Sequence, residues 1–326
     1  MENLNFLLDG IALALQPTNL LFLFGGVTIG TLIGVLPGIG PAGAIALLLP
    51  ATFHAPPLAA IIMLAGIMYG AQYGGSTTSI LVNIPGEPSS IITCIDGYQM
   101  ARQGRAGPAL GISAFASFIA GTLSLFGILT VAPPLAELGL MVFGLTLVVY
   151  LARGSLAKAL MMLGLGIMLA SVGLDRFTSA LRFTFELRVL RDGLGLPQMV
   201  IGLFGLSEVL AIVERTFSRS VYQGRIEGLL PTLRDWKVSI FPILRGTGIG
   251  FFLAVIPGIS VIIPTFITYS LEKKLSRHPE KFGNGAIEGV AGPEACNNAS
   301  SAGNLIPLLT LGIPTGASSA LLLAAF

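Results

Sequence analysis

The chain is organised in long apolar runs separated by short charged segments. No Asp, Glu, Lys or Arg occurs between Asp9 and Glu87. A membrane-spanning helix needs about 20 consecutive apolar residues, so this stretch alone has room for about three crossings. Further charge-free runs of helix length cover 106–136, 138–152, 159–174, 193–207, 246–271 and 295–326. The pattern predicts an all-α polytopic membrane protein with eight or more membrane segments.

Composition agrees with this pattern and excludes other classes of protein. Of the 326 residues, 53% are hydrophobic and only 10% are charged, against about 25% charged in a soluble domain. A formal net charge of +2 provides no basic stripe of the kind that binds nucleic acid. The expected surroundings of the chain are therefore a lipid bilayer.

Basic residues gather at four places, and the positive-inside rule assigns these places to the cytoplasm. They are Arg102 with Arg105, Arg153 with Lys158, the segment from Arg215 to Lys237, and the segment from Lys273 to Lys281. We therefore expect helices at 107–133, 139–152, 158–173 and 197–213 to cross the membrane alternately outward and inward. The stretch 174–196 is then left outside although it carries four further arginines, which are Arg176, Arg182, Arg188 and Arg191. Its acidic residues Asp175, Glu186 and Asp192 partly offset this charge, and its RFTFEL sequence predicts an ordered extended loop.

Two proline-containing motifs occur twice, in the same order. GTLIGVLPGIG at 30–40 aligns with GFFLAVIPGIS at 250–260, and IPGEPSS at 84–90 aligns with IPTGASS at 313–319. The later copy has a longer segment between its two motifs. Two matches in the same order, each within an apolar run, indicate an internal repeat.

The charges that follow the first motif predict how the two copies are oriented. Residues 51–57 contain no Lys or Arg, whereas residues 272–281 contain Lys273, Lys274, Arg277 and Lys281. If these loops are equivalent, the positive-inside rule places them on opposite sides of the membrane. Inverted-topology repeats with broken helices are the architecture of many secondary transporters.

The repeat also suggests a division of the chain. We expect residues 1–213 to form the first transmembrane repeat, with core hairpins at about 25–95 and further helices at 107–213. Residues 214–238 are expected to form a cytoplasmic linker, and residues 239–326 the start of the second, inverted repeat. Because the second copy stops soon after IPTGASS, inside an apolar run, we expect it to be truncated at the C-terminus.

Each repeated motif interrupts an apolar run with residues that break helices. Proline removes a backbone donor and glycine weakens a helix. Freed backbone groups cost several kcal/mol each in hydrocarbon, so such breaks persist where they line a protein cavity. We therefore expect re-entrant hairpins around a translocation site, with hinge and cation-binding backbone at Pro37, Gly38, Pro85, Gly86, Pro257, Gly258 and Pro314.

Polar side chains beside the breaks are candidates for substrate binding. Helix N-termini suit carboxylates, and hydroxyls and amides can complete the coordination. These candidates are Ser76, Thr77, Thr78, Asn83, Asn297, Asn298, Ser300 and Ser301. A single Ser or Thr in a membrane helix more often bonds the preceding turn or a neighbouring helix than a substrate. The adjacent amides of Asn297 and Asn298 are a stronger signal, because placing each of them in a bilayer costs free energy.

Two carboxylates, Glu87 and Glu294, lie at or near membrane depth, where ionisable residues are functional by default; a wet interface is the alternative. We assign Glu294 to the cation-binding set. The first broken region contains no Lys or Arg, so a multiply charged anion would need co-bound cations. This favours symport with Na⁺ or H⁺. We expect no other metal, no cofactor and no catalytic residue.

At these residues the sequence resembles the large membrane subunit of tripartite tricarboxylate transporters, the TctA type. The motifs are YGGSTTSILVNIPGEPSS, IDGYQMARQGRAG, RFTFEL, GLFGLSEVL and PEACNNASSAGNLIPLLTLGIPTGASS, and the resemblance extends from about Gly25 to Phe326. The family's paired polar hairpins map onto 76–90 and 297–319 and add further candidates, which are Ser89, Ser90, Thr315, Ser318 and Ser319. At Glu87 the family pattern leads us to expect a smaller polar residue.

The resemblance implies a multi-pass transporter subunit of the bacterial inner membrane. It implies uptake of citrate or another carboxylate, driven by Na⁺ or H⁺. It also implies two partners, a small membrane subunit of the TctB type and a periplasmic binding protein of the TctC type. The identity of the carboxylate, rocking or elevator motion, and homodimer formation are all left open.

Two other classes of function compete with transport. A membrane enzyme would need a catalytic constellation, whereas the only histidines are His54 and His278, in different repeats. A non-transporting scaffold or channel subunit is the second alternative. Saturable transport that requires a soluble binding protein would distinguish a transporter from both.

Overall fold

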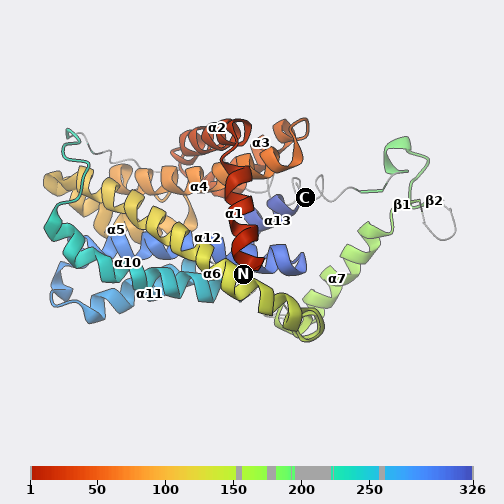
Figure 1. The fold of residues 1–326 in the computed structure, drawn as a ribbon. Helices are drawn as coiled ribbons and strands as arrows, with labels where there is room; N and C mark the ends of the chain where they lie inside the picture. The colour runs from red at the N-terminus through yellow and green to blue at the C-terminus, as the bar shows by residue number, and fades with distance from the viewer. Residues whose placement is uncertain are drawn as a thin grey trace.

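A computed structural model gives the fold of the chain and describes residues 2–151, 156–174, 181–191, 193–194, 222, 224–256 and 261–324. Most of these residues are helical (Figure 1). The elements are α1 (Glu2–Ala14), α2 (Pro17–Gly34), α3 (Gly40–Thr52), α4 (Pro57–Val82), η1 (Pro88–Ser90), α5 (Ile91–Met100), η2 (Ala101–Arg105), α6 (Ala106–Leu151), α7 (Leu156–Ala170), β1 (Gly173–Leu174), β2 (Leu181–Arg182), η3 (Arg188–Leu190), α10 (Leu233–Ala254), α11 (Ile262–Leu275), η5 (Pro279–Lys281), α12 (Glu288–Leu311) and α13 (Ala317–Leu323).

Several helices have the length and composition of membrane spans. Within the described residues, four stretches qualify: Pro17–Gly34, Pro57–Val82, Pro88–Ala132 and Leu233–Ala254. Large apolar side chains are exposed on them, such as Phe24 at 73% and Phe118 at 72%. Such surface is stable in lipid and not in water. The prediction of an all-α polytopic membrane protein is confirmed.

The predicted turn between helices 107–133 and 139–152 is wrong. Helix α6 runs from Ala106 to Leu151 without interruption. Only Glu137 separates the two apolar runs, and glutamate is a good helix former. The helix also continues through Pro133 and Pro134, although each lacks a backbone donor. Helix α7, at Leu156–Ala170, overlaps most of the predicted 158–173 segment, whereas 197–213 lies outside the described residues.

The RFTFEL segment is extended only at its start. Its Arg182 belongs to β2, which pairs antiparallel with β1, with Gly173 opposite Arg182. Beyond the strand, Phe183 and Phe185 have φ angles of 53° and 48°, which turn the chain sharply. Both phenyl rings are exposed, and Figure 1 shows that α7 and the strand pair lie beyond one end of the helix bundle.

The same helix contacts occur in both copies of the repeat. Helix α2 packs along α4, and α10 packs along α12. Gly30 faces the backbone of Ile67 so closely that a Cβ atom would overlap it, and Gly250 faces the backbone of Cys296 in the same way. The first pair of motifs aligns Gly30 with Gly250, and the second pair aligns Ile67 with Cys296. The repeat predicted from the motifs therefore has a structural counterpart.

The two copies run in opposite directions. Gln72 of α4 donates to the Ser301 hydroxyl of α12, and Ser76, one turn later on α4, donates to Glu294, which lies earlier on α12. Helices α4 and α12 are therefore antiparallel, although they are equivalent in the repeat. Gln72 and Ser301 are themselves aligned positions, so a pseudo-twofold axis passes close to their contact.

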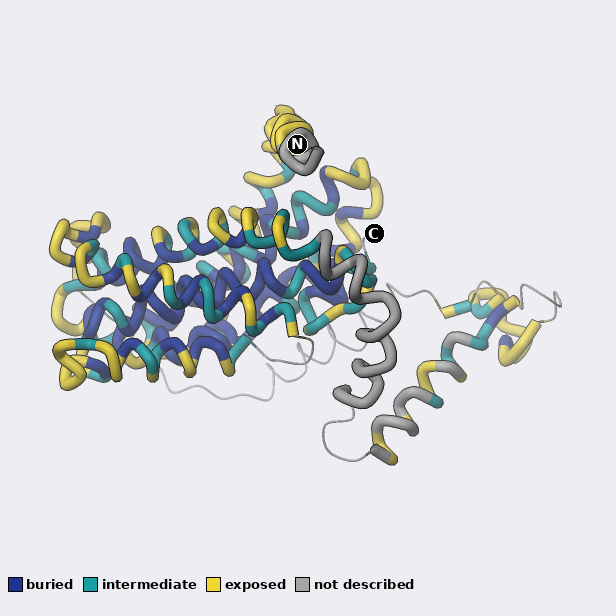
Figure 2. The backbone as a smooth tube through the Cα atoms, turned by 60° about the horizontal axis from the view of Figure 1, so that its bottom comes forward, coloured by how far each residue is buried: buried dark blue, intermediate teal, exposed yellow. Residues whose placement is uncertain are grey.

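Each copy also packs a segment against the other. Ile45 and Leu49 of α3 and Leu64 of α4 share a buried cluster with Leu321 of α13. In the reciprocal arrangement, η1 and α5 contact α11. A second buried cluster joins α6, α10 and α12, and Figure 2 shows the buried backbone concentrated in the bundle. The break segments are thus held between the copies.

The expected division of the chain is only partly within the described residues. Helix α10 begins at Leu233, ahead of residue 239 at which we expected the second repeat to start. Residues 214–221 of the expected linker lie outside the described residues. The proposed domain boundaries therefore stay a prediction.

The close approach of α2 and α4 leads to a testable prediction about the neighbouring residues Gly25 and Gly26. A Cβ at Gly26 would overlap the Met63 carbonyl, whereas Gly25 has open space around it. Gly26→Ala is expected to destabilise the fold by about 1–3 kcal/mol, because overpacking forces the helices apart. Gly25→Ala is the matched control. Thermal unfolding of both variants in detergent measures the difference, and equal melting temperatures would contradict the close α2–α4 packing.

Candidate functional site

The two breaks of the first copy meet at one place. Residues 35–39 join α2 to α3, and residues 83–87 join α4 to η1. The Gly38 N–H, at a residue with φ of 90°, donates to the Gly86 carbonyl at 3.2 Å. A Cβ at Gly86 would overlap the Gly75 backbone. Glycine is required at both positions because of a left-handed backbone in one case and close approach in the other.

The described break of the second copy has the same local geometry. Helix α4 ends at Asn83 with φ of 57°, and α12 ends at its aligned residue Gly312 with φ of 66°. Ser90 and Ser319 are also aligned, and each accepts from the amide three residues earlier, at 3.3 Å and 2.9 Å. Both hydroxyls donate back to the carbonyl of that same residue. The residues Pro257 and Gly258, in the other break of this copy, lie outside the described residues.

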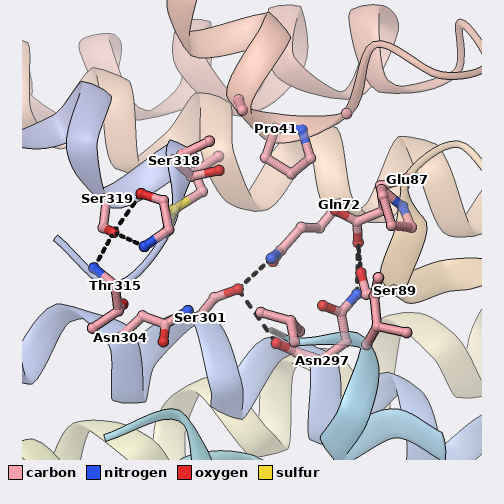
Figure 3. Close-up of a pocket in the computed structure, with 18 of the residues that line it drawn as sticks. Pro41, Gln72, Glu87, Ser89, Asn297, Ser301, Asn304, Thr315, Ser318 and Ser319 are labelled. Atoms are coloured by element: carbon pink, nitrogen blue, oxygen red, sulfur yellow. Dashed lines mark hydrogen bonds between the residues drawn. The ribbon is translucent and has the colours of Figure 1, made fainter. Parts of the chain in front are cut away.

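The tips of the two copies enclose a cavity of about 360 Å³ (Figure 3). Its polar side chains are Gln72, Glu87, Ser89, Asn297, Ser301, Asn304, Thr315, Ser318 and Ser319. The first turns of α3 and α11 complete the wall. Gln72 and Ser301, the pair near the pseudo-twofold axis, hydrogen-bond across this cavity. We call it the central cavity.

Glu87 contributes the one carboxylate among the described residues of the central cavity. It is 5% exposed, and its Oε1 accepts from Asn297 Nδ2 at 2.7 Å and from Ser89 Oγ at 2.7 Å. No Lys or Arg belongs to the described lining. Burying a carboxylate without a cationic partner costs free energy, so we expect Glu87 to bind a proton or a cation.

Several oxygen atoms around this cavity have no hydrogen-bond partner. They are Gln72 Oε1, Asn297 Oδ1, Asn304 Oδ1 and Thr315 Oγ1. The amide nitrogen of Asn297 donates to Glu87, as an ionised carboxylate, which only accepts, requires. Figure 3 shows the nitrogen on that side. Buried polar atoms in native proteins are normally satisfied, so these oxygens are available to accept from water or a ligand or to coordinate a cation.

A second buried carboxylate, Glu294, lies outside the central cavity. It is 1% exposed, and its oxygens accept from Ser76 at 2.8 and 3.0 Å, from Ser113 at 2.9 Å and from Thr93. These hydroxyls come from α4, α6 and α5, so the carboxylate joins three helices to α12. We call this group the Glu294 cluster.

Comparison with known proteins identifies the family of this chain. The model of the tripartite tricarboxylate transporter TctA family matches residues 20–326. The chain belongs to the TctA family.

Two curated relatives come from Agrobacterium vitis. One, described as "Uncharacterized 52.8 kDa protein in TAR-I ttuC' 3'region", is 47% identical over 336 residues, which cover all of this chain and 67% of the relative. The other, described as "Uncharacterized protein in TAR-II ttuC' 3'region", is 53% identical over 77 residues, or 24% of this chain and 32% of the relative. No solved structure gives a significant match to this TctA-family chain.

Of the side chains predicted to bind substrate, the structure brings six to the central cavity: Ser89, Asn297, Ser301, Thr315, Ser318 and Ser319. Ser89 and Ser318 are aligned positions of the two copies. The break residues Pro37, Gly38, Pro85, Gly86 and Pro314 lie beside the cavity in sequence without lining it.

The other predicted ligands of this TctA-family chain face elsewhere. Ser76 belongs to the Glu294 cluster, and Asn83 is exposed at the end of α4. Thr77, Thr78 and Ser300 donate to carbonyls at 2.9, 2.8 and 3.2 Å, the last two on neighbouring segments. Ser90 caps its turn, and Asn298 donates to Ser117 Oγ at 2.7 Å, on a different face of α12 from the one that lines the central cavity. Glu294, assigned to the cation-binding set, likewise lies away from the cavity.

Two cavity residues were missed by sequence reasoning. Gln72 lies one turn before the singled-out STTS segment, and Asn304 lies one turn after NNASS. Both are amides within membrane-depth helices, which is a signal of its own because an amide in a bilayer requires a partner. Both lie within one helical turn of a polar motif, so extending each motif by one turn in both directions adds them to the candidates.

Proposed function

We propose that the protein is the large membrane subunit of a secondary transporter that moves carboxylates across the bacterial inner membrane, with the substrate and a coupling Na⁺ or H⁺ bound together in the central cavity. The observation that carries this proposal is the cavity itself. It lies between inverted copies, presents unpartnered oxygens and one carboxylate, and has no basic residue in its described lining. Membership of a transporter family favours transport over catalysis.

Donors for a carboxylate are available on two sides of the cavity. The first turns of α3 and α11, equivalent elements of the two copies, line it, and neither helix has a side-chain cap. A helix N-terminus carries partial positive charge and N–H groups that suit an anion. The aligned hydroxyls of Ser89 and Ser318 lie beside them. A substrate with two or more carboxylates could thus engage both copies at once.

Acceptors for a cation lie on α4, on α12 and in the connection between α4 and η1. Glu87 and the carbonyl oxygens of Gln72 and Asn297 are hard oxygen ligands, the kind that coordinates Na⁺ in broken-helix transporters. Alternatively, Glu87 takes up a proton. In both cases the added positive charge offsets the repulsion between Glu87 and a carboxylate substrate, which couples the two binding events.

The inverted copies support an alternating-access mechanism, in which one part of the bundle moves relative to the cavity. The family name implies a tripartite assembly, and we propose that the partners are a small membrane subunit of the TctB type and a periplasmic binding protein of the TctC type. The binding protein would deliver citrate or a related carboxylate to the outer face.

Uptake of radiolabelled carboxylate tests the proposed function. The protein is expressed from its complete gene with candidate partner genes, and Na⁺ and proton gradients are imposed separately. Saturable uptake that follows one gradient and requires the binding protein is expected. Uptake indifferent to both gradients would contradict symport, and non-saturating flux without the binding protein would indicate a channel.

Two variants test whether the cation dependence of uptake arises in the central cavity. Glu87→Gln removes the carboxylate charge while preserving an acceptor, so the cation concentration for half-maximal uptake is expected to change by about tenfold or more, equivalent to about 1.4 kcal/mol. Glu280→Gln, at a side chain that is 66% exposed, is the matched control. An unchanged cation dependence in Glu87→Gln would remove Glu87 from the coupling site.

A further inference from the structure

A second cavity lies away from the central cavity, beside the start of α10. It measures about 810 Å³ and shares no lining residue with the central cavity. Six basic side chains line it: Arg105, Arg234, Lys237, Arg245, Arg277 and Lys281. They come from the end of η2, from α10, and from the connection between α11 and α12. We call it the basic cavity.

Only part of this positive charge is neutralised by the protein. Arg105 pairs with Asp235, and Arg245 forms a two-bond pair with Glu272 at 2.8 and 2.5 Å. The remaining four basic residues form no ion pair within the described part of the chain, although Glu280, next to the lining in sequence, attracts Lys281. The one other carboxylate in the lining is Glu288. The cavity therefore has surplus positive charge, which attracts an anion.

The same cavity continues onto an apolar surface. On α10, Arg234 and Lys237 are followed one turn later by Val238 and Phe241, which also line the cavity. Val238 and Phe241 are 40% and 62% exposed. Spacings of three and four residues place these side chains on one face of the helix. Leu275 of α11 adds an exposed apolar wall. The basic end and the apolar face match the two parts of a phospholipid.

The basic cavity has no counterpart in the first copy. The segments that the repeat aligns with the start of α10 and with the end of α11, at 13–17 and 51–57, contain no Lys or Arg. The positive-inside rule therefore predicts that this end of the bundle is cytoplasmic. Basic pockets between membrane helices on that side are suited to anionic lipid headgroups.

We propose that the basic cavity binds an anionic phospholipid. The phosphate lies among Arg234, Lys237, Arg277 and Lys281, and an acyl chain follows Val238 along α10. This inference does not depend on the substrate or the coupling ion of the transporter.

The test measures thermal unfolding and lipid binding of the whole purified protein in detergent, with phosphatidylglycerol as the probe and phosphatidylcholine as the neutral lipid. Phosphatidylglycerol is expected to raise the melting temperature, and phosphatidylcholine is not. The variant R277Q/K281Q is expected to bind phosphatidylglycerol about thirtyfold more weakly, as follows from removing two basic contacts. Native mass spectrometry gives the affinities.

The matched control is K273Q/K274Q, which removes the same charge from two exposed residues of α11 that do not line the cavity. It is expected to bind phosphatidylglycerol like the wild type. Equal weakening in both variants would overturn the proposal, because it would show attraction to net charge only. Equal stabilisation of the wild type by both lipids would also overturn it. Stabilisation by inorganic phosphate or pyrophosphate but not by the lipid would assign the cavity to a free anion instead.

Discussion

Replacing Asn297 with alanine is expected to abolish carboxylate uptake while leaving the protein in the membrane. Asn297 donates to Glu87 at 2.7 Å and directs an unpartnered oxygen into the central cavity. Its removal leaves Glu87 with one fewer donor and removes a ligand. Truncating one partner of a buried, charged hydrogen bond costs about 2–5 kcal/mol, so uptake should fall about 100-fold.

The neighbouring amide supplies the control for this experiment. Asn298→Ala changes a residue of the same type on the same helix, but Asn298 faces Ser117 and α6 instead of the cavity. Asn298 Nδ2 donates to Ser117 Oγ and to the Glu294 carbonyl, both outside the central cavity. Losing these ordinary hydrogen bonds is expected to change uptake by no more than about threefold. Both variants are compared at equal membrane abundance. Retained uptake in Asn297→Ala, or equal losses in both, would remove Asn297 from the site.

Replacing Glu294 with alanine is expected to destabilise the bundle. Three hydroxyls, from Ser76, Thr93 and Ser113, lose their acceptor at once, and the side chain that joins α4, α5 and α6 to α12 is gone. Leaving buried donors unsatisfied costs about 1–3 kcal/mol each. The melting temperature in detergent should fall by roughly 5–10 °C, because about 1 kcal/mol corresponds to a few degrees in a protein of this size.

Glu288→Ala is the control for Glu294, because Glu288 lies on the same helix, is partly exposed, and has no ion pair within the described residues. Glu294→Gln should lie between the two, since its carbonyl still accepts hydrogen bonds but its NH₂ group cannot. A Glu294→Ala variant that melts with the wild type would show that the Glu294 cluster does not hold these helices together.

The architecture could be predicted from the sequence because prolines and glycines mark the positions where membrane helices break. Proline and glycine at the first motif pair, Pro37-Gly38 and Pro257-Gly258, mark positions where a helix loses donors or stability. Their repetition gave the register that aligns Gly30 with Gly250, and the contacts of α2 and α10 repeat in that register. The inverted orientation followed from the unequal charge of two equivalent loops.

The side of the helix on which each polar side chain lies could not be predicted from the sequence. Helices α4 and α12 have apolar and small residues on all sides, so no amphipathic stripe identifies the cavity face. Asn297 and Asn298 are adjacent in sequence but about 100° apart around the helix, at 3.6 residues per turn. One therefore lines the cavity and the other contacts α6. Only the tertiary packing distinguishes them.

The packing of α13 against α3 determines when the first copy can finish folding. Ile45 and Leu49 share a buried cluster with Leu321, and Leu321 is synthesised much later than either of them. At a translation rate of about 5–20 residues per second, the delay is roughly 15–55 s. During that interval the α3 face stays uncovered in the membrane, so the nascent chain is open to mispairing with another copy or to holding by insertion factors until α13 is synthesised.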